Sequence, residues 1–372
     1  MLKEKKMKKL KFFTSVIVMA LVLAFVGCKH EIADPVHELQ VLEFTGTPYT
    51  ELLAGTDGTL GTAGRYVLFG DWPQTIKASD VVINEYVISY MGMFTYYKGS
   101  DGAWYAKCAE NAYGTNYTYS DGTTVARSSA NSYKYFKVEP IKWRILTDSY
   151  SGKKLLLAEN ILTANKYYDY NGDRSIGDAT VYPNNYKESR IRAWLNGLSY
   201  TVKASIDDQQ TENSEFQGRG FLQTAFTDAI RTKIATDTTI DNSARSTNTD
   251  AKANQWNSGN NDYACENTTD KVFLLSEQEV TTSDYGFAAY NVYQEDSNGT
   301  MESTRIRMTT DYAKANYAIQ NPTAGYGGWW WLRSPDWYDS DYACGVLGDG
   351  YVLSADFVQL TSGGVCPALC LK

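Results

Sequence analysis

The sequence ends in a stretch that combines two kinds of residue: "GGWWWLRSPDWYDSDYACGVLGDGYVLSADFVQLTSGGVCPALCLK", residues 327–372. Its two flanks are apolar and typical of a packed scaffold, whereas the middle is rich in Asp, Tyr, Ser and Gly. Val346, Val352 and Val358 recur through this middle part, and a strand sends alternate side chains to opposite faces. We therefore expect the three valines to face inward, with turns marked by Gly345, Gly348 and Gly350.

The side chains between the valines are expected to face outward and to bind a ligand. Aromatic residues offer large contact area at low entropic cost, and Ser and Asp offer adaptable polar contacts. Five aspartates, including Asp336, make this face anionic, which favours a basic partner, although solubility explains them equally well. A plain terminal β-meander also accounts for the valines. The expected binding residues are Trp337, Tyr338, Asp339, Ser340, Asp341, Tyr342, Leu347, Asp349, Tyr351, Leu353, Ala355, Asp356 and Phe357.

The tryptophan run at 329–331 allows two interpretations. One tryptophan could form the floor of the binding face. Alternatively, all three pack on the two faces of the sheet while Arg333 pairs with a carboxylate.

Short strands dominate the rest of the chain, with fewer helices. Runs such as "RYVLFGDWPQT" (65–75), "VEPIKWRILTD" (138–148) and "KKLLLAEN" (153–160) have strand length and end at turn residues. Helical spacing appears at 184–200, with Ser189 or Asn185 as N-cap and Gly197 as the stop, at 219–234 and at 309–319. Long polar loops lie between them. This pattern predicts an α+β domain with two or three helices and long loops.

Composition limits the possible functions. The 372 residues carry a net charge of −8, and an acidic chain is a poor partner for nucleic acid because phosphate binding needs a cationic face. The only histidines, His30 and His37, precede the expected fold. A histidine-based triad, a histidine-rich metal site or a histidine general base is therefore not expected in the main domain. We predict a protein that is not an enzyme, with no catalytic residues, no metal site and no cofactor.

The N-terminus has the pattern of an export signal. A cationic segment precedes the apolar run 12–27, which is too short for a comfortable membrane span. Gly27-Cys28 follows directly and resembles the lipobox of bacterial lipoproteins, in the relaxed form with Phe25 in place of Leu. That resemblance implies acylation at Cys28 and anchoring to the bacterial cell envelope, at the outer membrane surface. An ordinary secretory peptide with a chance cysteine is the alternative. We expect a leader at 1–27, a lipidated cysteine and tether at 28–63, and one domain at 64–372.

Several short blocks along the chain carry a wider resemblance. In order they are "YVLFGDWPQT", "EPIKWRIL", "LLLAENIL", "SRIRAWLNG", "FLQTAF", "DKVFLLSEQE", "YGF", "TDYAKA", "WWLRSP" and "GVCPALCL". This series resembles bacterial exported domains with a C-type-lectin-like fold of the formylglycine-generating-enzyme-like branch. It is most similar to the treponemal variable proteins, lipoproteins diversified by a retroelement. The sequence departs from the family at Cys366 and Cys370, where Arg and Trp are usual.

This resemblance implies that adenines in the coding template are replaced at random, so that the segment at 336–362 varies. The segment contains five Asp, three Tyr and no Lys, Arg, Glu, Met or Asn, as such replacement would leave it. Only Trp337 and Gln359 fall outside the set that replacement produces at asparagine codons, and each is explained by a fixed template residue or another adenine-bearing codon. The implied function is a surface-displayed lipoprotein that binds an unknown protein or small molecule through this variable segment.

Two other functions stay open. The family's namesake branch uses two C-terminal cysteines with metal, so Cys366 and Cys370 raise the possibility of a thiol oxidase. In a regular strand, however, the two lie about 13 Å apart, too far for a disulfide or one shared ion. A calcium-dependent sugar-binding lectin would carry Glu-Pro-Asn or Gln-Pro-Asp motifs, which the sequence lacks.

Overall fold

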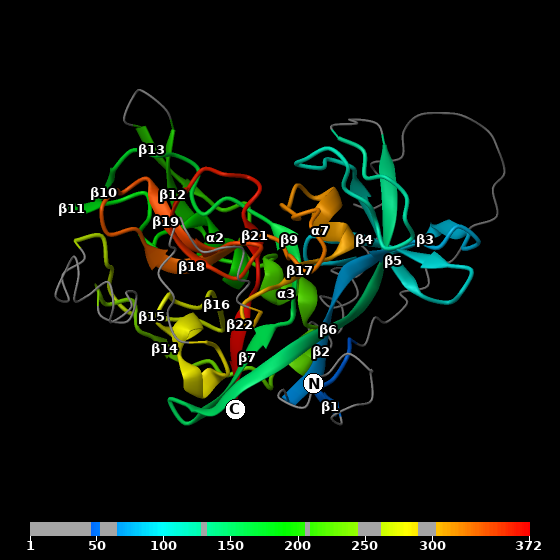
Figure 1. Cartoon of the computed structure of the whole chain (residues 1–372), viewed down its shortest axis with the longest axis horizontal. Helices are drawn as coiled ribbons and strands as arrows, with labels where there is room; N and C mark the ends of the chain where they lie inside the picture. Colours follow the sequence, from blue (N-terminus) through cyan, green and yellow to red (C-terminus); the bar gives the residue numbers. More distant parts are fainter. Residues whose placement is uncertain (1–45, 53–64, 128–131, 205–208, 245–261, 289–302) are drawn as a thin grey trace, which may run out of the picture. The chain divides into compact units, whose positions relative to one another are not determined.

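The fold is described from a computed structural model for residues 46–52, 65–127, 132–204, 209–244, 262–288 and 303–372 (Figure 1). The expected leader, the lipidation site at Cys28 and most of the tether lie outside these residues. Within the described ranges, no helix is both long and apolar enough to cross a bilayer.

Nine strands form the larger sheet, in the order β16-β22-β7-β6-β5-β4-β3, with β2 paired to β6 and β1 to β2. All of the pairings are antiparallel. The strands are β1 (Thr50–Leu52), β2 (Arg65–Ile76), β3 (Ile83–Met91), β4 (Phe94–Gly99), β5 (Trp104–Ala109), β6 (Tyr133–Tyr150), β7 (Lys153–Ala158), β16 (Val272–Phe273) and β22 (Ala368–Leu371).

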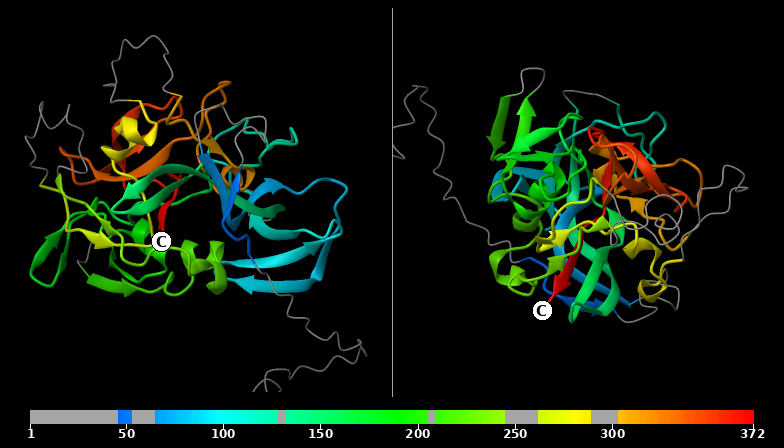
Figure 2. Two further views of the ribbon diagram at one scale, coloured as in Figure 1. Left: turned by 90° about the horizontal axis from the view of Figure 1, so that it is seen from below. Right: turned by 90° about the vertical axis from the view of Figure 1, so that its left-hand side faces the viewer.

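Five strands form the second sheet, in the order β20-β19-β18-β21-β9. Its central strand β18 pairs antiparallel with β19 and parallel with β21. The strands are β9 (Thr163–Ala164), β18 (Trp330–Pro335), β19 (Tyr342–Val346), β20 (Val352–Phe357) and β21 (Gly364–Val365). Strands β18 to β20 lie at one end of the folded unit and β3 to β5 at the other (Figures 1 and 2).

Smaller elements surround these sheets. Four two-stranded ladders are described: β8 (Asn160–Ile161) with β17 (Met308–Thr309), β10 (Arg174–Ile176) with β11 (Ala179–Val181), β12 (Tyr200–Ala204) with β13 (Gln209–Asn213), and β14 (Thr239–Ile240) with β15 (Thr268–Thr269). The described helices are α2 (Arg190–Asn196), α3 (Phe221–Ala225), α4 (Asp228–Arg231), α7 (Asp311–Ala315) and the 3-10 turns η2 (Glu279–Thr281) and η3 (Ser283–Tyr285).

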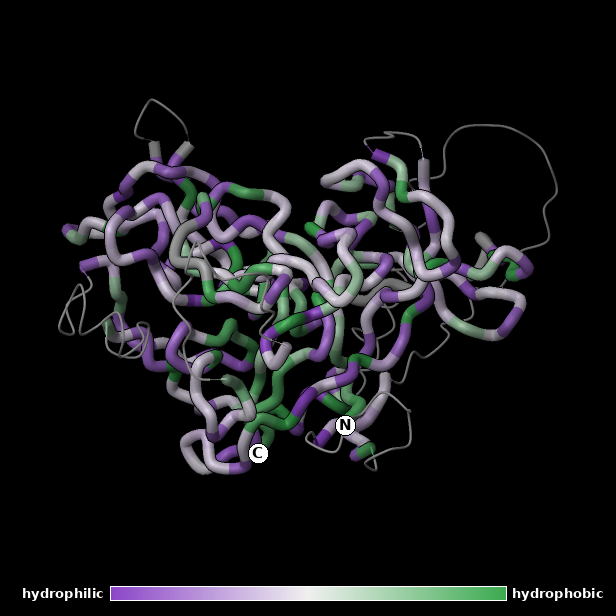
Figure 3. The backbone as a smooth tube through the Cα atoms, in the orientation of Figure 1, coloured by the Kyte–Doolittle hydropathy of each residue, from purple (hydrophilic) through white to green (hydrophobic). Residues whose placement is uncertain are grey.

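Two of the segments that connect the two sheets lie side by side. Strand β7 ends at Ala158 in the larger sheet and β9 lies in the smaller, while β21 lies in the smaller and β22 in the larger. The amide of Ala158 donates to the carbonyl of Pro367 at 2.9 Å, and that of Leu162 to the carbonyl of Val365 at 3.1 Å. Buried apolar residues surround this junction, and hydrophobic stretches gather around β7 and β22 (Figure 3).

The expectation of an α+β, lectin-like domain is wrong. Strands account for 39% of the structure and helices for 11%, so the protein is mostly β with several antiparallel sheets. The periodic segments correctly mark helices, but each described α-helix is only four to seven residues long. Helices this short have little stability of their own, and the sheets supply most of the backbone hydrogen bonding.

Helix α2 forms as its sequence predicts. Ser189 is the N-cap, and its hydroxyl accepts a hydrogen bond from the amide of Arg192 at 3.2 Å. Gly197 ends the helix in the left-handed conformation, with φ of 70°. The segment at 219–234 instead divides into α3 and α4, because Phe226 is extended and packs its ring 4.9 Å from that of Phe69.

Two boundaries also differ from expectation. Residues 50–52, expected in the tether, pair with β2, and the hydroxyl of Thr47 donates to Asp71 at 2.6 Å. The folded unit therefore begins before residue 64. At the other end, Cys366 and Pro367 interrupt the expected final strand, so Cys366 and Cys370 do not share one regular strand.

All three tryptophans of the 329–331 run are buried, which confirms that they pack on both faces of the sheet. The rings of Trp329 and Trp331 lie 4.3 Å apart. A Cβ atom on Gly345 would lie 2.8 Å from the Trp329 ring, and one on Gly363 would lie 1.9 Å from the Trp331 ring. Gly345 therefore lies within β19 because an indole covers it, and the expectation that it marks a turn is wrong.

Arg333 pairs with a carboxylate, as one interpretation of the sequence predicted. Its Nη1 contacts Glu279 Oε2 at 2.5 Å and its Nη2 contacts Glu279 Oε1 at 2.9 Å, a bidentate pair. Burial alone would raise the pKa of Glu279, but the charge of Arg333 and the hydrogen bonds to the carboxylate hold that pKa below its ordinary value.

Removing one member of this pair should strongly destabilise the fold. We expect Glu279→Ala to lower the free energy of unfolding by about 3–5 kcal/mol, because it leaves a buried guanidinium without its counter-charge. Urea denaturation measures this. Asp228→Ala, which breaks the exposed pair with Arg231, is the matched control and should change stability little. An equal, small effect of both substitutions would contradict the prediction.

The same pair should give a defined acid dependence. Because the folded-state pKa of Glu279 is depressed, its contribution to stability is complete above the ordinary value of 4.5 and is lost as the pH falls through the folded-state pKa. The wild type should therefore lose stability in this acid range more steeply than Glu279→Gln, which has no proton to take up. Parallel pH profiles of unfolding would show that this carboxyl is not responsible.

Candidate functional site

The three valines of the C-terminal segment face inward, as predicted. Val346 and Val358 have no exposed surface and Val352 is 3% exposed. Val346 and Val352 pair across β19 and β20, next to the turn that joins these strands. The hairpin is therefore packed into the fold by side chains that point inward, and not by those on its outer side.

The loop at 336–341 connects β18 to β19. A buried residue from another part of the chain, Asn184, binds this loop. Asn184 is fully buried, and its Nδ2 donates to the carbonyls of Asp339 at 3.2 Å and Tyr342 at 3.0 Å. Its main-chain amide donates to the carbonyl of Ser340 at 3.1 Å. All three bonds end on main-chain oxygen, so they do not depend on which side chains the loop carries.

Asp336 has a structural role in the loop. It is 4% exposed, and its Oδ1 accepts hydrogen bonds from the amides of Tyr338 at 2.7 Å and Asp339 at 2.9 Å. This is the local turn that aspartate side chains favour. Counting Asp336 among the charges of an outward anionic face is therefore wrong, because its carboxylate points back into the loop.

Aromatic side chains cover the outer side at this end of the hairpin. Tyr338 is 77% exposed and Phe357 is 45% exposed. Tyr342 and Phe357 are cross-strand partners whose rings lie 4.3 Å apart, and the rings of Trp337 and Tyr338 lie 5.5 Å apart. Ring pairs of this kind stabilise each other beyond what the area they bury would give.

Three carboxylates accompany these rings: Asp339, Asp341 and Asp356, all half-buried. Burial and the neighbouring Asp339 raise the pKa of Asp341, and burial raises the pKa of Asp356. Burial and then these carboxylates also raise the pKa of Tyr342. No described cation forms an ion pair with any of the three. We call the seven residues the aromatic–acidic patch: Trp337, Tyr338, Asp339, Asp341, Tyr342, Asp356 and Phe357.

The remaining expected binding residues lie elsewhere. Leu347 is half-buried and packs against the core, Asp349 accepts a hydrogen bond from the amide of Tyr351 at 3.1 Å, and Tyr351 itself is only 6% exposed. The expectation that Tyr351 faces outward is therefore wrong. Ser340 is half-buried in the loop. Leu353 and Ala355 belong to β20, and the structure describes only their backbone.

The expected single binding face does not form, because its residues lie at two ends of the hairpin and some of them are buried. Leu347, Asp349 and Tyr351 form the tip of the hairpin, near the Val346–Val352 pair, whereas Tyr342 and Phe357 pair at its other end. Four residue steps along β19 separate the ends by about 13 Å. The aromatic–acidic patch is the part that combines exposed rings with unpaired charge, and it is the candidate binding site.

The residue that positions this site, Asn184, was not identified from the sequence. It lies in "YPNNYKESR", where an asparagine is an ordinary loop residue. Its partners follow it by more than 150 positions. No local spacing signals such a contact, and only the folded chain shows it.

The comparisons with known proteins give a family but no function. Residues 151–372 match a family model described as a domain of unknown function, DUF6273. No curated protein matches the chain significantly, and no solved structure does either. The matched region runs from the start of β7 to the last residue and includes the whole aromatic–acidic patch. Because the match covers more than half of the sequence, the chain belongs to the DUF6273 family.

Proposed function

We propose that this protein is a recognition protein held at the bacterial cell envelope by a lipid on Cys28, with the aromatic–acidic patch as its ligand-binding site. A retroelement diversifies the outward residues of the segment at 336–362, so that specificity changes while the scaffold persists. Both the anchor and the diversification come from the sequence resemblance. The geometry of the patch supports the recognition role.

The observation that carries this proposal is the separation of two sets of interactions. Inward valines and tryptophans pack the hairpin, and Asn184 holds the loop through main-chain oxygens. Rings such as Tyr338 and Phe357 contact solvent. Exchanging the outward side chains therefore removes no hydrogen bond that Asn184 makes to the loop.

The patch fits a partner that presents basic groups beside a flat apolar surface. Trp337, Tyr338 and Phe357 are rigid rings of the kind that dominate binding energy when they enter a pocket. The carboxylates of Asp339, Asp341 and Asp356 attract cations and speed association at low salt. Binding through this patch is therefore expected to weaken as the ionic strength rises.

The thiol-oxidase alternative has less support from the geometry. Cys366 and Cys370 are both buried, and burial raises the pKa of each thiol to about 12. The reactive species in thiol chemistry is the thiolate, and such thiols stay protonated near neutral pH. Cys366 donates to the carbonyl of Asn160 at 3.4 Å, as expected of a packed side chain.

The separation of packing from binding predicts unequal effects on stability. We expect Val346→Ala to lower the free energy of unfolding by about 2 kcal/mol, because it leaves a cavity in the core. Tyr338→Ala should change it by less than about 0.5 kcal/mol. Urea denaturation of both variants measures these changes in the free energy of unfolding. A large loss of stability in Tyr338→Ala would mean that the patch is part of the scaffold.

Retroelement diversification predicts a second copy of the coding segment. The parent genome should contain a near-copy of the codons for 336–362 beside a reverse transcriptase gene, with differences confined to adenines of the copy. The codons for Asp336, Val346, Val352 and Val358 should agree, because the loop turn and the core need these side chains. Substitutions at the three valines, or a complete genome without such a copy, would remove diversification from the proposal.

The binding role can be tested with a displayed library. Randomising Tyr338, Asp339, Tyr342 and Phe357 should yield folded binders to lysozyme, used here as a basic probe protein, at least about ten times as often as a matched library on another sheet. The control library randomises Lys107, Tyr133, Tyr135 and Lys137 on β5 and β6. Equal yields from both libraries would show that the patch has no special capacity for recognition.

A further inference from the structure

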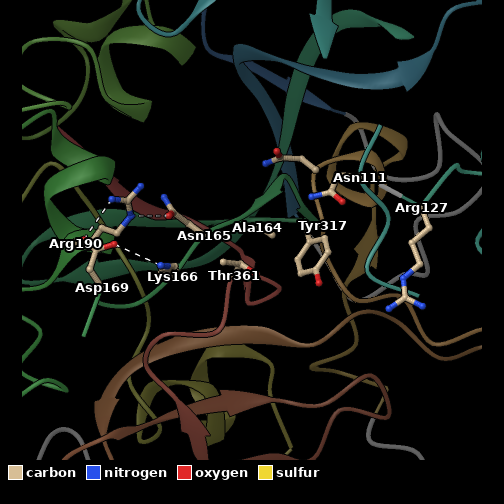
Figure 4. A pocket seen from close by; sticks show the side chains of 10 residues that line it. Asn111, Arg127, Ala164, Asn165, Lys166, Asp169, Arg190, Tyr317 and Thr361 are labelled. Atoms are coloured by element: carbon tan, nitrogen blue, oxygen red, sulfur yellow. Dashed lines mark hydrogen bonds and ion pairs between the residues drawn. The ribbon is translucent and has the colours of Figure 1, made fainter. Parts of the chain in front are cut away.

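A polar pocket of about 650 Å³ lies beside β9, apart from the aromatic–acidic patch. Its walls come from distant parts of the chain: the segment after β9, the start of α2, the end of α7 and the segment after β5. Arg190, Asp169 and Lys166 lie at one end and Arg127 at the other, with Asn165 and Tyr317 between them (Figure 4). Its volume is that of a small-molecule site.

Positive charge prevails in this pocket, although the chain as a whole is acidic. Arg127, Lys166 and Arg190 line it with a single carboxylate, Asp169. Lys166 Nζ lies 3.8 Å and Arg190 Nη1 lies 3.4 Å from the oxygens of Asp169. Arg190 also forms an ion pair with Glu215 at 2.5 Å, a residue that does not line the pocket.

Arg127 is the cation that remains available to a ligand. It is exposed, and no described residue forms a hydrogen bond or ion pair with it. A guanidinium presents a planar fork of donors that matches a carboxylate. In an acidic protein, such a group in a concave polar site favours an anionic ligand.

Neutral polar side chains in the pocket also have hydrogen-bond donors and acceptors without a described partner. Asn165 Oδ1 accepts from Arg190 Nε at 3.2 Å, which leaves its Nδ2 as a donor. Among the described residues, no partner bonds to the side-chain amide of Asn111, the hydroxyl of Tyr317 or that of Thr361. The set offers both donors and acceptors around one cavity. A ligand with several hydroxyl groups would satisfy more of them than a simple inorganic anion could.

Tyr317 occupies a strained position in this wall. It directly follows the C-cap of α7 and has φ of 73°, in the left-handed region. The amide of Ala318 donates to the carbonyl of Ala313 at 2.9 Å, which completes the helix-ending motif that normally has glycine at this place. A tyrosine there is strained, because its Cβ comes close to the following carbonyl oxygen. Its ring packs edge-on against Tyr113 at 5.4 Å. Such strain suggests that the side chain has a function.

We infer that this pocket binds an acidic saccharide, a sugar unit that carries a carboxylate. Arg127 would bind the carboxylate, and the side-chain amides of Asn111 and Asn165 would bind hydroxyl groups. The ring of Tyr317 would pack against the apolar C–H face of the sugar. This site is separate from the aromatic–acidic patch, since none of its lining residues belongs to the patch.

The test is a titration of the full chain with sodium glucuronate and with digalacturonate, followed by saturation-transfer and chemical-shift NMR. Glucose and inorganic phosphate are the comparison ligands. We expect the acidic sugars to bind with Kd of about 1 mM or tighter, and glucose at least about tenfold more weakly. Equal binding of glucose would overturn the role of charge. Phosphate binding as tight as that of the sugars would overturn the saccharide assignment in favour of a small-anion site.

Variants then show which groups act. Arg127→Ala should weaken binding of the acidic sugars at least about tenfold, and Arg231→Ala on α4, outside the pocket, should leave it unchanged. Tyr317→Gly relieves the backbone strain, so it should keep or raise the melting temperature while it weakens sugar binding. Full binding by Tyr317→Gly, or by Arg127→Ala, would refute the site as we describe it.

A further control separates this inference from the proposed function. Tyr338→Ala changes only the aromatic–acidic patch and should leave sugar binding intact. Absence of binding by any acidic sugar at about 10 mM would end the saccharide proposal and leave the recognition proposal untouched.

Discussion

The buried ion pair of Arg333 and Glu279 joins the two sheets. Arg333 belongs to β18, the central strand of the smaller sheet, and Glu279 follows β16 of the larger one. The guanidinium also donates to the carbonyl of Leu274 at 2.8 Å, and the amide of Arg333 donates to that of Leu275 at 2.9 Å. Charges this deeply buried stabilise a fold only when their geometry is good. The bidentate contact and the added hydrogen bonds meet that condition and fix the position of β18.

Other side chains pack on both faces of β18. The residues beside this strand must therefore leave room for the indole rings of residues 329–331. Glycines at 345 and 363 provide the room, since any side chain there would meet Trp329 or Trp331. The loop that leaves β18 then passes over Asn184, which binds its main chain. Because Asn184 binds only the main chain of the loop, the loop's outward side chains can differ without loss of these hydrogen bonds. Recognition surfaces on other scaffolds depend on the same division between framework and contact residues.

Two surfaces of opposite charge result from this arrangement. The aromatic–acidic patch presents three carboxylates without a described cation, and the pocket beside β9 presents an arginine without a described acid. The chain segments that carry them are hydrogen-bonded to each other: the amide of Tyr168 donates to the carbonyl of Val358 at 2.9 Å, and the side-chain Nε2 of Gln359 donates to the carbonyl of Asp169 at 3.0 Å. One surface would engage a basic partner and the other an acidic small molecule.

The sequence by itself determined the local features. Strand segments and the inward valines follow from periodicity. The N-cap of α2 and the pairing of Arg333 with a carboxylate were each one of two possibilities that the sequence allowed, based on capping chemistry and the rarity of unpaired buried charge. Tertiary structure decided the rest. The domain is mostly β, because the helices that form are short and most of the regular structure is in extended β-ladders. In the folded chain the final strand is also interrupted at Cys366, Tyr351 is buried, and Asn184 binds the loop at 336–341. Each of these depends on contacts between residues far apart in the chain, and such contacts leave no spacing pattern in the sequence.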